Sequence, residues 1–293
     1  GPSTGATLRA ARHWLEEVIG AGETSLMDGL QTLFLALIQG LTEFLPVSSS
    51  AHLILPSQLF GWPDQGLAFD VAVHAGTLVA VIVYYRESLS SLLMGVLGSG
   101  DNVSLRRREV AALLIATLPA VMIGIAFSDV IDQYLRGIGV IATTTLLFGV
   151  LLGVSYSYRA AGADEQPISR LDHALVIGLA QALALIPGTS RSGVTITASL
   201  FLGYNLATSA RFSFLMSIPV IAGALLLLLV KEFELFFSSA NLTLTLIAML
   251  VAAVSAYATI AFFVGLVTRV GMMPFVIYRV LLALILFSIL VFV

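Results

Sequence analysis

Two short polar segments inside a strongly apolar chain constrain the fold more than any other feature of this sequence. They read QGLTEFLPVSSSAH at residues 39–52 and PGTSRSG at residues 187–193. Hydrophobic residues make up 58% of the 293 residues and charged residues only 11%, whereas a soluble domain carries about 25% charged residues. In a membrane every backbone polar group must be satisfied within the protein. We therefore expect an all-α polytopic membrane protein that encloses both polar segments.

Both polar segments interrupt apolar stretches that would otherwise be helices. Pro46 and three serines break the stretch 27–60, so neither half reaches the ~20 residues that a spanning helix needs. A Pro-Gly pair and a further glycine break the stretch 172–203. Non-helical backbone at membrane depth is tolerated only where it is buried in protein or lines a wet cavity. We predict two re-entrant helical hairpins; for the first, one kinked spanning helix followed by a surface loop is the alternative.

Six further stretches are long enough to be transmembrane helices, at residues 67–85, 109–127, 138–158, 212–230, 242–267 and 274–293. The order is a hairpin and three spans, twice over, within a single membrane domain. Repeat one is predicted to cover 27–158 and repeat two 172–293. Because each repeat crosses an odd number of times, the second is inverted, and the broken helices of such repeats meet near the midplane. Residues 1–26 are expected to be an expression remnant or linker, with a native surface helix as the alternative.

The basic residues between the spans predict the orientation. Residues 86–108 are predicted to be a loop and contain four arginines. If this loop is cytoplasmic, that side carries eight basic residues and the other side two, Arg136 and Lys231. Basic residues favour the cytoplasmic side. The first hairpin is then expected to enter from outside and the second from the cytoplasm.

The first polar segment places an amide and a carboxylate on one helix face, since Gln39 and Glu43 are four residues apart. A charged side chain inside a bilayer costs about 2.5–3.5 kcal/mol on insertion scales and is a functional candidate by default. Glu43 could hold Mg²⁺ or Ca²⁺ together with substrate phosphates and waters, and Gln39 could add a carbonyl oxygen or bind the substrate. The alternative is that Glu43 pairs with Arg191 as structure alone.

The serines that follow are candidates for nucleophilic chemistry. Ser48 and Ser49 precede His52 by four and three residues, so both hydroxyls are within reach of the imidazole if this part is helical. A serine becomes a nucleophile when a base is adjacent, and His52 is the candidate nearby. The alternative is that the serines cap the second half-helix and His52 is a satisfied core residue.

The second polar segment supplies a cation and a cradle for phosphate. The planar guanidinium of Arg191 suits phosphate oxygens, and free N–H groups at a helix start attract anions. The glycines permit close approach of the backbone. The residues that we expect to bind substrate here are Arg191, Gly188, Thr189, Ser190 and Ser192.

Two other sets of polar residues lie within spans. Arg279, near the start of the last span, either binds an anion or snorkels to the interface. Asp70, His74 and Thr77 share one face of the first full span. They either line the pocket or neutralise one another near the interface. The chain has no cysteine, which excludes disulfides and thiolate chemistry.

These motifs resemble the undecaprenyl pyrophosphate phosphatase family, also called bacitracin-resistance proteins. The family pattern Glu/Gln-x-x-x-Glu, then Pro-x-Ser-Ser and a nearby His, is matched by residues 39–52. Its second pattern, Pro-Gly-x-Ser-Arg-Ser-Gly, is matched by residues 187–193. FSFLMSIP (212–219) and PFVIYR (274–279) are also similar, so the resemblance runs from about residue 27 to residue 293.

The resemblance implies a hydrolase that converts undecaprenyl pyrophosphate to the monophosphate at the outer face of the bacterial inner membrane. Such an enzyme recycles the lipid carrier for cell-wall synthesis and confers bacitracin resistance. The roles implied are Ser49 as nucleophile with Ser48 beside it, His52 as its partner, Glu43 as metal or base residue, and Arg191 as pyrophosphate clamp.

Several alternatives remain open beside this implied reaction. His52 or an activated water could attack instead of Ser49, and Gln39 at the first motif position weakens any mechanism with two carboxylates there. The cofactor expected is Mg²⁺ or Ca²⁺. The partners expected are the polyprenyl pyrophosphate lipid and membrane lipids, with a homodimer as an option and no nucleic acid. The alternative function is a transporter or flippase of an anionic polyprenyl phosphate lipid that uses the same pocket.

Overall fold

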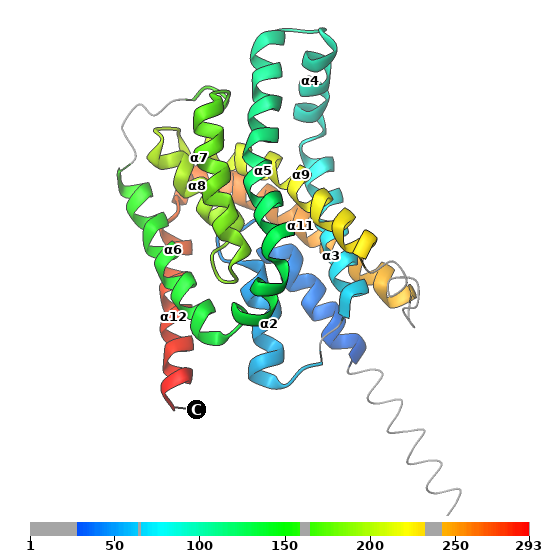
Figure 1. Ribbon diagram of the computed structural model, residues 1–293, viewed down its shortest axis with the longest axis vertical. Helices are drawn as coiled ribbons and strands as arrows, with labels where there is room; N and C mark the ends of the chain where they lie inside the picture. Colours follow the sequence, from blue (N-terminus) through cyan, green and yellow to red (C-terminus); the bar gives the residue numbers. More distant parts are fainter. Residues whose placement is uncertain (1–27, 64–65, 159–164, 232–241, 293) are drawn as a thin grey trace, which may run out of the picture.

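The computed structural model describes residues 28–63, 66–158, 165–231 and 242–292, and within them the chain is helical with no β-strand (Figure 1). Five helices are long and apolar enough to cross a membrane, and a bent pair, α3 with α4, makes a sixth candidate. The all-α membrane architecture expected from the sequence is confirmed. Residues 1–26, expected to be a remnant or linker, lie outside the described residues.

Both apolar stretches with polar insertions are broken where the sequence predicted. A helix over residues 28–42 leads into non-helical residues 43–48, and α2 (Ser49–Phe60) follows. The second stretch contains α7 (Leu171–Ala182), a 3-10 turn (Leu183–Leu185) and α8 (Arg191–Phe201). Proline at the breaks removes a backbone hydrogen bond of the helix, and glycine has a low helix propensity.

The second helix of each broken pair begins after a serine N-cap with a positive φ. Ser48 has φ 78° and its hydroxyl accepts from the N–H of Ala51 at 3.4 Å. Ser190 has φ 72° and its hydroxyl accepts from the N–H of Gly193 at 3.2 Å. Serine is a favoured N-cap because its oxygen satisfies a free N–H of the first turn. The capping alternative for the first serine of the SSS run is therefore correct.

The remaining spans agree with the predicted ones to within a few residues at most of their ends. They are α3 (Gly66–Tyr84), α6 (Ile138–Tyr158), α9 (Leu206–Lys231), α11 (Leu242–Val270) and α12 (Met273–Phe292). Each first span packs on the second span of the other predicted repeat, since α3 contacts α11 and α9 contacts α5 (Val103–Tyr134). Gly76 allows the close approach of α3 to Met249 of α11, as small residues do at membrane helix interfaces.

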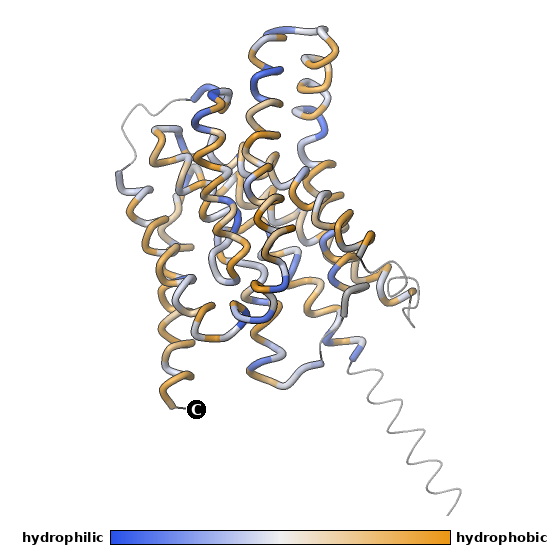
Figure 2. The backbone as a smooth tube through the Cα atoms, viewed as in Figure 1, coloured by the Kyte–Doolittle hydropathy of each residue, from blue (hydrophilic) through white to orange (hydrophobic). Residues whose placement is uncertain are grey.

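Two predicted loops were wrong. Residues 86–97, expected in a loop, form α4 (Arg86–Leu97), and α5 continues to Tyr134 through most of residues 128–137, which connect the predicted spans 109–127 and 138–158. The charged residues indicated a loop, but α4 buries Leu92 and Gly95 and exposes Leu93 and Leu97 together with Arg86 and Glu87. The α4–α5 hairpin extends beyond the other helices, and its tip is hydrophilic (Figures 1 and 2).

Candidate active site

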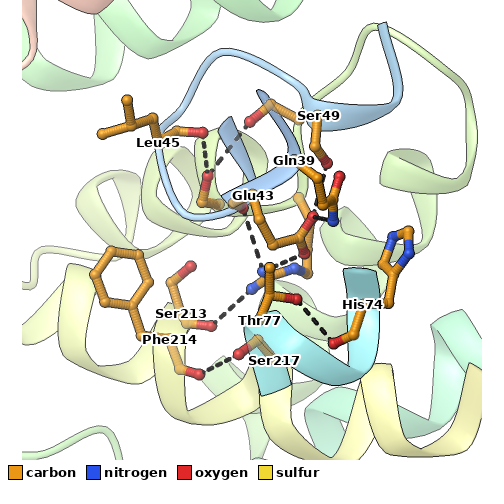
Figure 3. A network of polar contacts seen from close by, with 12 residues as sticks. Gln39, Glu43, Leu45, Ser49, His74, Thr77, Ser213, Phe214 and Ser217 are labelled. Carbon is orange, nitrogen blue, oxygen red and sulfur yellow. Dashed lines mark hydrogen bonds and ion pairs between the residues drawn. The ribbon is translucent and has the colours of Figure 1, made fainter. Parts of the chain in front are cut away.

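The two polar segments meet in the interior of the helix assembly (Figure 3). The hydroxyl of Ser192 donates to the carbonyl oxygen of Leu45 at 2.9 Å. Nη2 of Arg191 donates to Oε1 of Glu43 at 3.0 Å. Residues more than 140 positions apart in the chain therefore form one polar centre, which is the arrangement that the sequence led us to expect.

Glu43 is the hub of this centre. Its Oε2 accepts hydrogen bonds from the hydroxyl of Ser49 at 2.7 Å and from Nε2 of Gln39 at 3.0 Å, and its Oε1 accepts from Arg191. The side chains of Glu43 and Arg191 are only 8% and 11% exposed. A charge buried to this degree persists only when it is paired and hydrogen-bonded, so Arg191 keeps the carboxylate ionised. The Glu43–Arg191 pair foreseen as an alternative exists.

Ser49 is placed for proton transfer to Glu43. It is the first residue of α2, directly after the positive-φ cap at Ser48, and this turn directs its hydroxyl back toward the preceding helix. A hydroxyl that already donates to a carboxylate can lose its proton to that carboxylate when it attacks. The group that can serve as base for Ser49 is therefore Glu43.

The predicted pairing of Ser49 with His52 is not formed. Nδ1 of His52 lies 2.7 Å from the carbonyl oxygen of Ser48, and Nε2 lies 2.5 Å from the hydroxyl of Tyr278. Spacing alone places both serines within a helix. In the structure the hydroxyl of Ser48 caps α2 and also contacts the hydroxyl of Ser50 at 3.1 Å. His52 thus links α2 to α12. Both of its ring nitrogens have partners, as the alternative of a satisfied core residue expected.

Arg279 does not snorkel to the interface, so that expectation was wrong, and its binding of an anion stays a prediction. It is 0% exposed. Its guanidinium donates to the carbonyl oxygens of Pro46 at 3.2 Å, Gly188 at 2.9 Å and Thr145 at 3.2 Å, with a longer contact of 3.4 Å to Thr144. One side chain therefore satisfies carbonyls of both broken segments and holds the two turns together.

The predicted substrate-binding residues of the second segment have different surroundings. Arg191 and Ser190 line a cavity, as expected of substrate-binding residues. Ser192 is bonded to Leu45, and Gly188 has φ 91° with no room for a side chain against Thr144. The hydroxyl of Thr189 is buried without a partner among the described residues. Gly188 and Ser192 thus shape the turn rather than face the cavity.

Two adjoining cavities lie beside the polar centre, and the Glu43–Arg191 pair lines one of them. The first, here called the Arg191 cavity, has a volume of about 290 Å³ and is lined by Glu43, Ser48, Ser49, Ser50, Asp70, His74, Ala184, Ser190, Arg191, Val220, Ile221, Ala224 and Leu225. The second, the Trp62 cavity, has a volume of about 270 Å³ and includes Trp62, Arg136, Ser57, Phe69 and Leu53. Both share Ser49, Ser50, Asp70 and His74. Polar groups thus gather at one end of the Arg191 cavity, and apolar residues of α9 form its other wall.

His74 and Asp70 belong to the site, although the motifs did not select them. Their spacing allowed either a pocket-lining or an interfacial role, and in the structure both residues line both cavities. Figure 3 shows the His74 ring extending from α3 on the side of the network where Gln39 and Ser49 lie. The available signal was the helical spacing of polar residues on an otherwise apolar span.

The oxygen atoms of Glu43 and Gln39 could bind a cation that arrives together with phosphate. They do not form a complete set of metal ligands by themselves. No group of three His, Cys, Asp or Glu residues suited to a metal occurs in the described ranges. A carboxylate has about four acceptor positions, and three of those on Glu43 are taken. Gln39 must present its NH₂ to Glu43, which leaves its Oε1 buried and without a partner among the residues described. One carboxylate and one amide oxygen, completed by substrate oxygens and waters, suit Mg²⁺.

Comparison with known proteins now assigns the chain to a family. Residues 32–285 match the family described as bacitracin resistance protein BacA. The chain belongs to this family. It is 52% identical over 267 residues to the undecaprenyl-diphosphatase of Teredinibacter turnerae, covering 89% of this chain and 99% of that protein. It is 55% identical over 265 residues to the undecaprenyl-diphosphatase of Alcanivorax borkumensis, covering 87% and 97%. The matched range of the BacA family contains both polar segments, so the whole candidate site falls within it.

Proposed function

We propose that this protein hydrolyses undecaprenyl diphosphate to undecaprenyl phosphate and inorganic phosphate. The relatives that bear the name undecaprenyl-diphosphatase align with it over nearly their whole length. The observation that carries the proposal is the hydroxyl of Ser49 held at 2.7 Å from Glu43, beside the cation of Arg191, in a cavity with an apolar wall. This is the combination that a lipid diphosphate requires.

In the first chemical step, Oγ of Ser49 attacks the terminal phosphorus of the substrate. The bond between that phosphorus and the bridging oxygen breaks, and the lipid monophosphate leaves with the bridging oxygen. The proton of Ser49 passes to Oε2 of Glu43, to which the hydroxyl already donates. Arg191 and the first turns of α2 and α8 oppose the charge that spreads over the phosphoryl oxygens. Water then releases phosphate from Ser49.

A divalent cation, Mg²⁺ or Ca²⁺, is part of the proposal. Glu43 and the buried Oε1 of Gln39 would hold it together with phosphate oxygens of the substrate. When bound, the ion supplies positive charge that offsets the charge of the diphosphate. The protein residues continue to orient Ser49 and to exclude bulk water.

The first isoprene units of the prenyl chain can pack against the apolar wall of the Arg191 cavity. Ile221 and Leu225 of α9 lie on this wall, so a lipid that enters from the bilayer can keep its tail in apolar surroundings while its diphosphate reaches Arg191. We place the protein in the bacterial inner membrane with the site facing outward, because the basic residues of the connecting segments would then lie in the cytoplasm.

The test is phosphate release by purified protein from the C55 lipid diphosphate and from farnesyl diphosphate, with Mg²⁺ and with EDTA. The expected result is metal-dependent release that Ser49→Ala and Arg191→Ala each reduce by at least 100-fold, about the contribution of one positioned catalytic group. Well-folded protein that releases no phosphate in any condition would refute the proposal. Movement of the lipid between leaflets in such a sample would favour the transporter alternative.

A further inference from the structure

His74 is held in one tautomer by its own helix. Its Nδ1 lies 2.7 Å from the carbonyl oxygen of Asp70, one turn earlier in α3. A carbonyl oxygen can only accept, so Nδ1 carries the hydrogen, and in the neutral ring Nε2 presents a lone pair. One turn of α3 therefore creates an imidazole with a fixed, basic nitrogen.

That basic nitrogen is free for chemistry. His74 lines the Arg191 cavity and the Trp62 cavity, and no described residue makes a hydrogen bond to its Nε2. The other two histidines of the described chain are engaged elsewhere: His52 uses both nitrogens, with Ser48 and Tyr278, and His173 contacts the hydroxyl of Tyr204 at 2.9 Å. Neither of them lines a cavity that contains Ser49.

We propose that His74 is a catalytic residue of the second half of the reaction, the hydrolysis of phosphorylated Ser49. Its Nε2 takes a proton from the water that attacks phosphorus, the bond between phosphorus and Oγ of Ser49 breaks, and Oγ recovers its proton from Glu43. The products are inorganic phosphate, a free serine, an ionised Glu43 and a protonated His74, which then loses its proton to water. The assignment rests on the proposed function, in which Glu43 already holds the proton of Ser49.

The surroundings of His74 suit this role. The charged groups that face the same space are Glu43 from the turn after the first helix, Arg191 from α8 and Asp70 from α3 itself, with Arg136 lining the Trp62 cavity. Arg191 is paired with Glu43 at 3.0 Å, so the positive charge of Arg191 in this space is largely offset by the carboxylate. His74, Ser49, Ser50 and Asp70 also line the Trp62 cavity, which is a second space beside Ser49 where the attacking water can lie.

The experiment follows the phosphoryl group after rapid mixing with substrate labelled at the terminal phosphate. In His74→Gln and His74→Ala, about one equivalent of lipid monophosphate per protein should form quickly while labelled phosphate stays on Ser49. The decay of this phosphoserine should be 10²–10⁴-fold slower than in the unsubstituted protein, the usual contribution of a general base. Added imidazole should accelerate the decay in His74→Ala. His173→Ala is the matched control, because it removes a histidine that touches neither cavity, and it should decay at the normal rate.

Each other result overturns the assignment. Turnover at the normal rate in both His74 variants, or slow turnover without retained phosphoserine, would show that His74 does not activate the water. If neither variant folds, the unsubstituted protein decides: decay of its phosphoserine must be slower in D₂O than in H₂O, because a general base takes a proton from the attacking water, and a decay without a solvent isotope effect would overturn the assignment. Absence of any phosphate release by the unsubstituted protein would instead refute the proposed function itself.

Discussion

Replacing Arg279 with methionine should destabilise the protein and abolish activity without removing any group from the cavities. The side chain is 0% exposed and donates to carbonyls of Pro46, Gly188 and Thr145 at 2.9–3.2 Å. Methionine has similar length but no donor, so these buried carbonyls would lose their partner.

The magnitude follows from these contacts. A hydrogen bond to a charged group contributes about 1.5–3 kcal/mol, so three of them give an upper bound of about 5–9 kcal/mol. Burying the guanidinium costs part of that gain, and breaking comparable buried charged contacts is known to cost about 3–5 kcal/mol. For chains of 150–250 residues 1 kcal/mol shifts Tm by about 2–4 °C, so for this longer chain we expect a fall in Tm of about 10 °C.

The assay is thermal unfolding in detergent, followed by tryptophan fluorescence, together with phosphate release well below the lower Tm. Arg279→Lys should lie between the parent and Arg279→Met, because one ammonium group cannot reach carbonyls spread over three segments. Arg269→Met, which removes an exposed arginine at the end of α11, is the control and should shift Tm by less than about 2 °C. An unchanged Tm in Arg279→Met would refute the view that this side chain joins the two turns.

The remaining predictions concern the reacting groups. Glu43→Gln should lower phosphate release by at least 100-fold, because an amide cannot take the proton of Ser49; release near the parental rate would remove Glu43 as the base. Tyr278→Phe should lower release by less than tenfold, since His52 and Tyr278 contact each other outside the cavities; a loss as large as that of Ser49→Ala would restore a catalytic role for His52. EDTA should stop release but leave Tm unchanged, because the described residues form no metal cage, and calorimetry with and without EDTA measures this.

The sequence predicted the parts of the fold that depend on local chemistry. Pro46 with the serines that follow it, and the Pro-Gly pair at 187–188 with the polar residues that follow it, interrupt apolar stretches, and both interruptions were found at the right residues. The central position of Glu43 among the polar residues could be anticipated from the cost of a carboxylate in a membrane. The meeting of Glu43 and Arg191 could be inferred because neither charge is tolerable there alone.

The side-chain contacts of the site could not be predicted, because the spacing of residues in the sequence does not define the direction in which each side chain points. A positive φ at Ser48 turns the chain so that Ser49 faces Glu43, and the expected contact with His52 is lost. Arg279 binds backbone carbonyls from three segments, and a sequence does not reveal which carbonyls a distant turn leaves without partners. His74 carried no motif, and only its place on α3 relative to the two turns brings it to the site.

The two broken segments have similar starts but contribute different chemistry. In each, a serine with positive φ caps a helix, and the next residue is the first of that helix: Ser49 after Ser48, and Arg191 after Ser190. The first position of one helix thus supplies the proposed nucleophile, and the same position of the other supplies the cation that would receive the phosphate. Both helices direct the positive end of their dipole toward this point. A fold that brings two such helix starts together therefore needs few additional groups to bind a diphosphate, and Glu43, bonded to both first residues, is the group on which their combination depends.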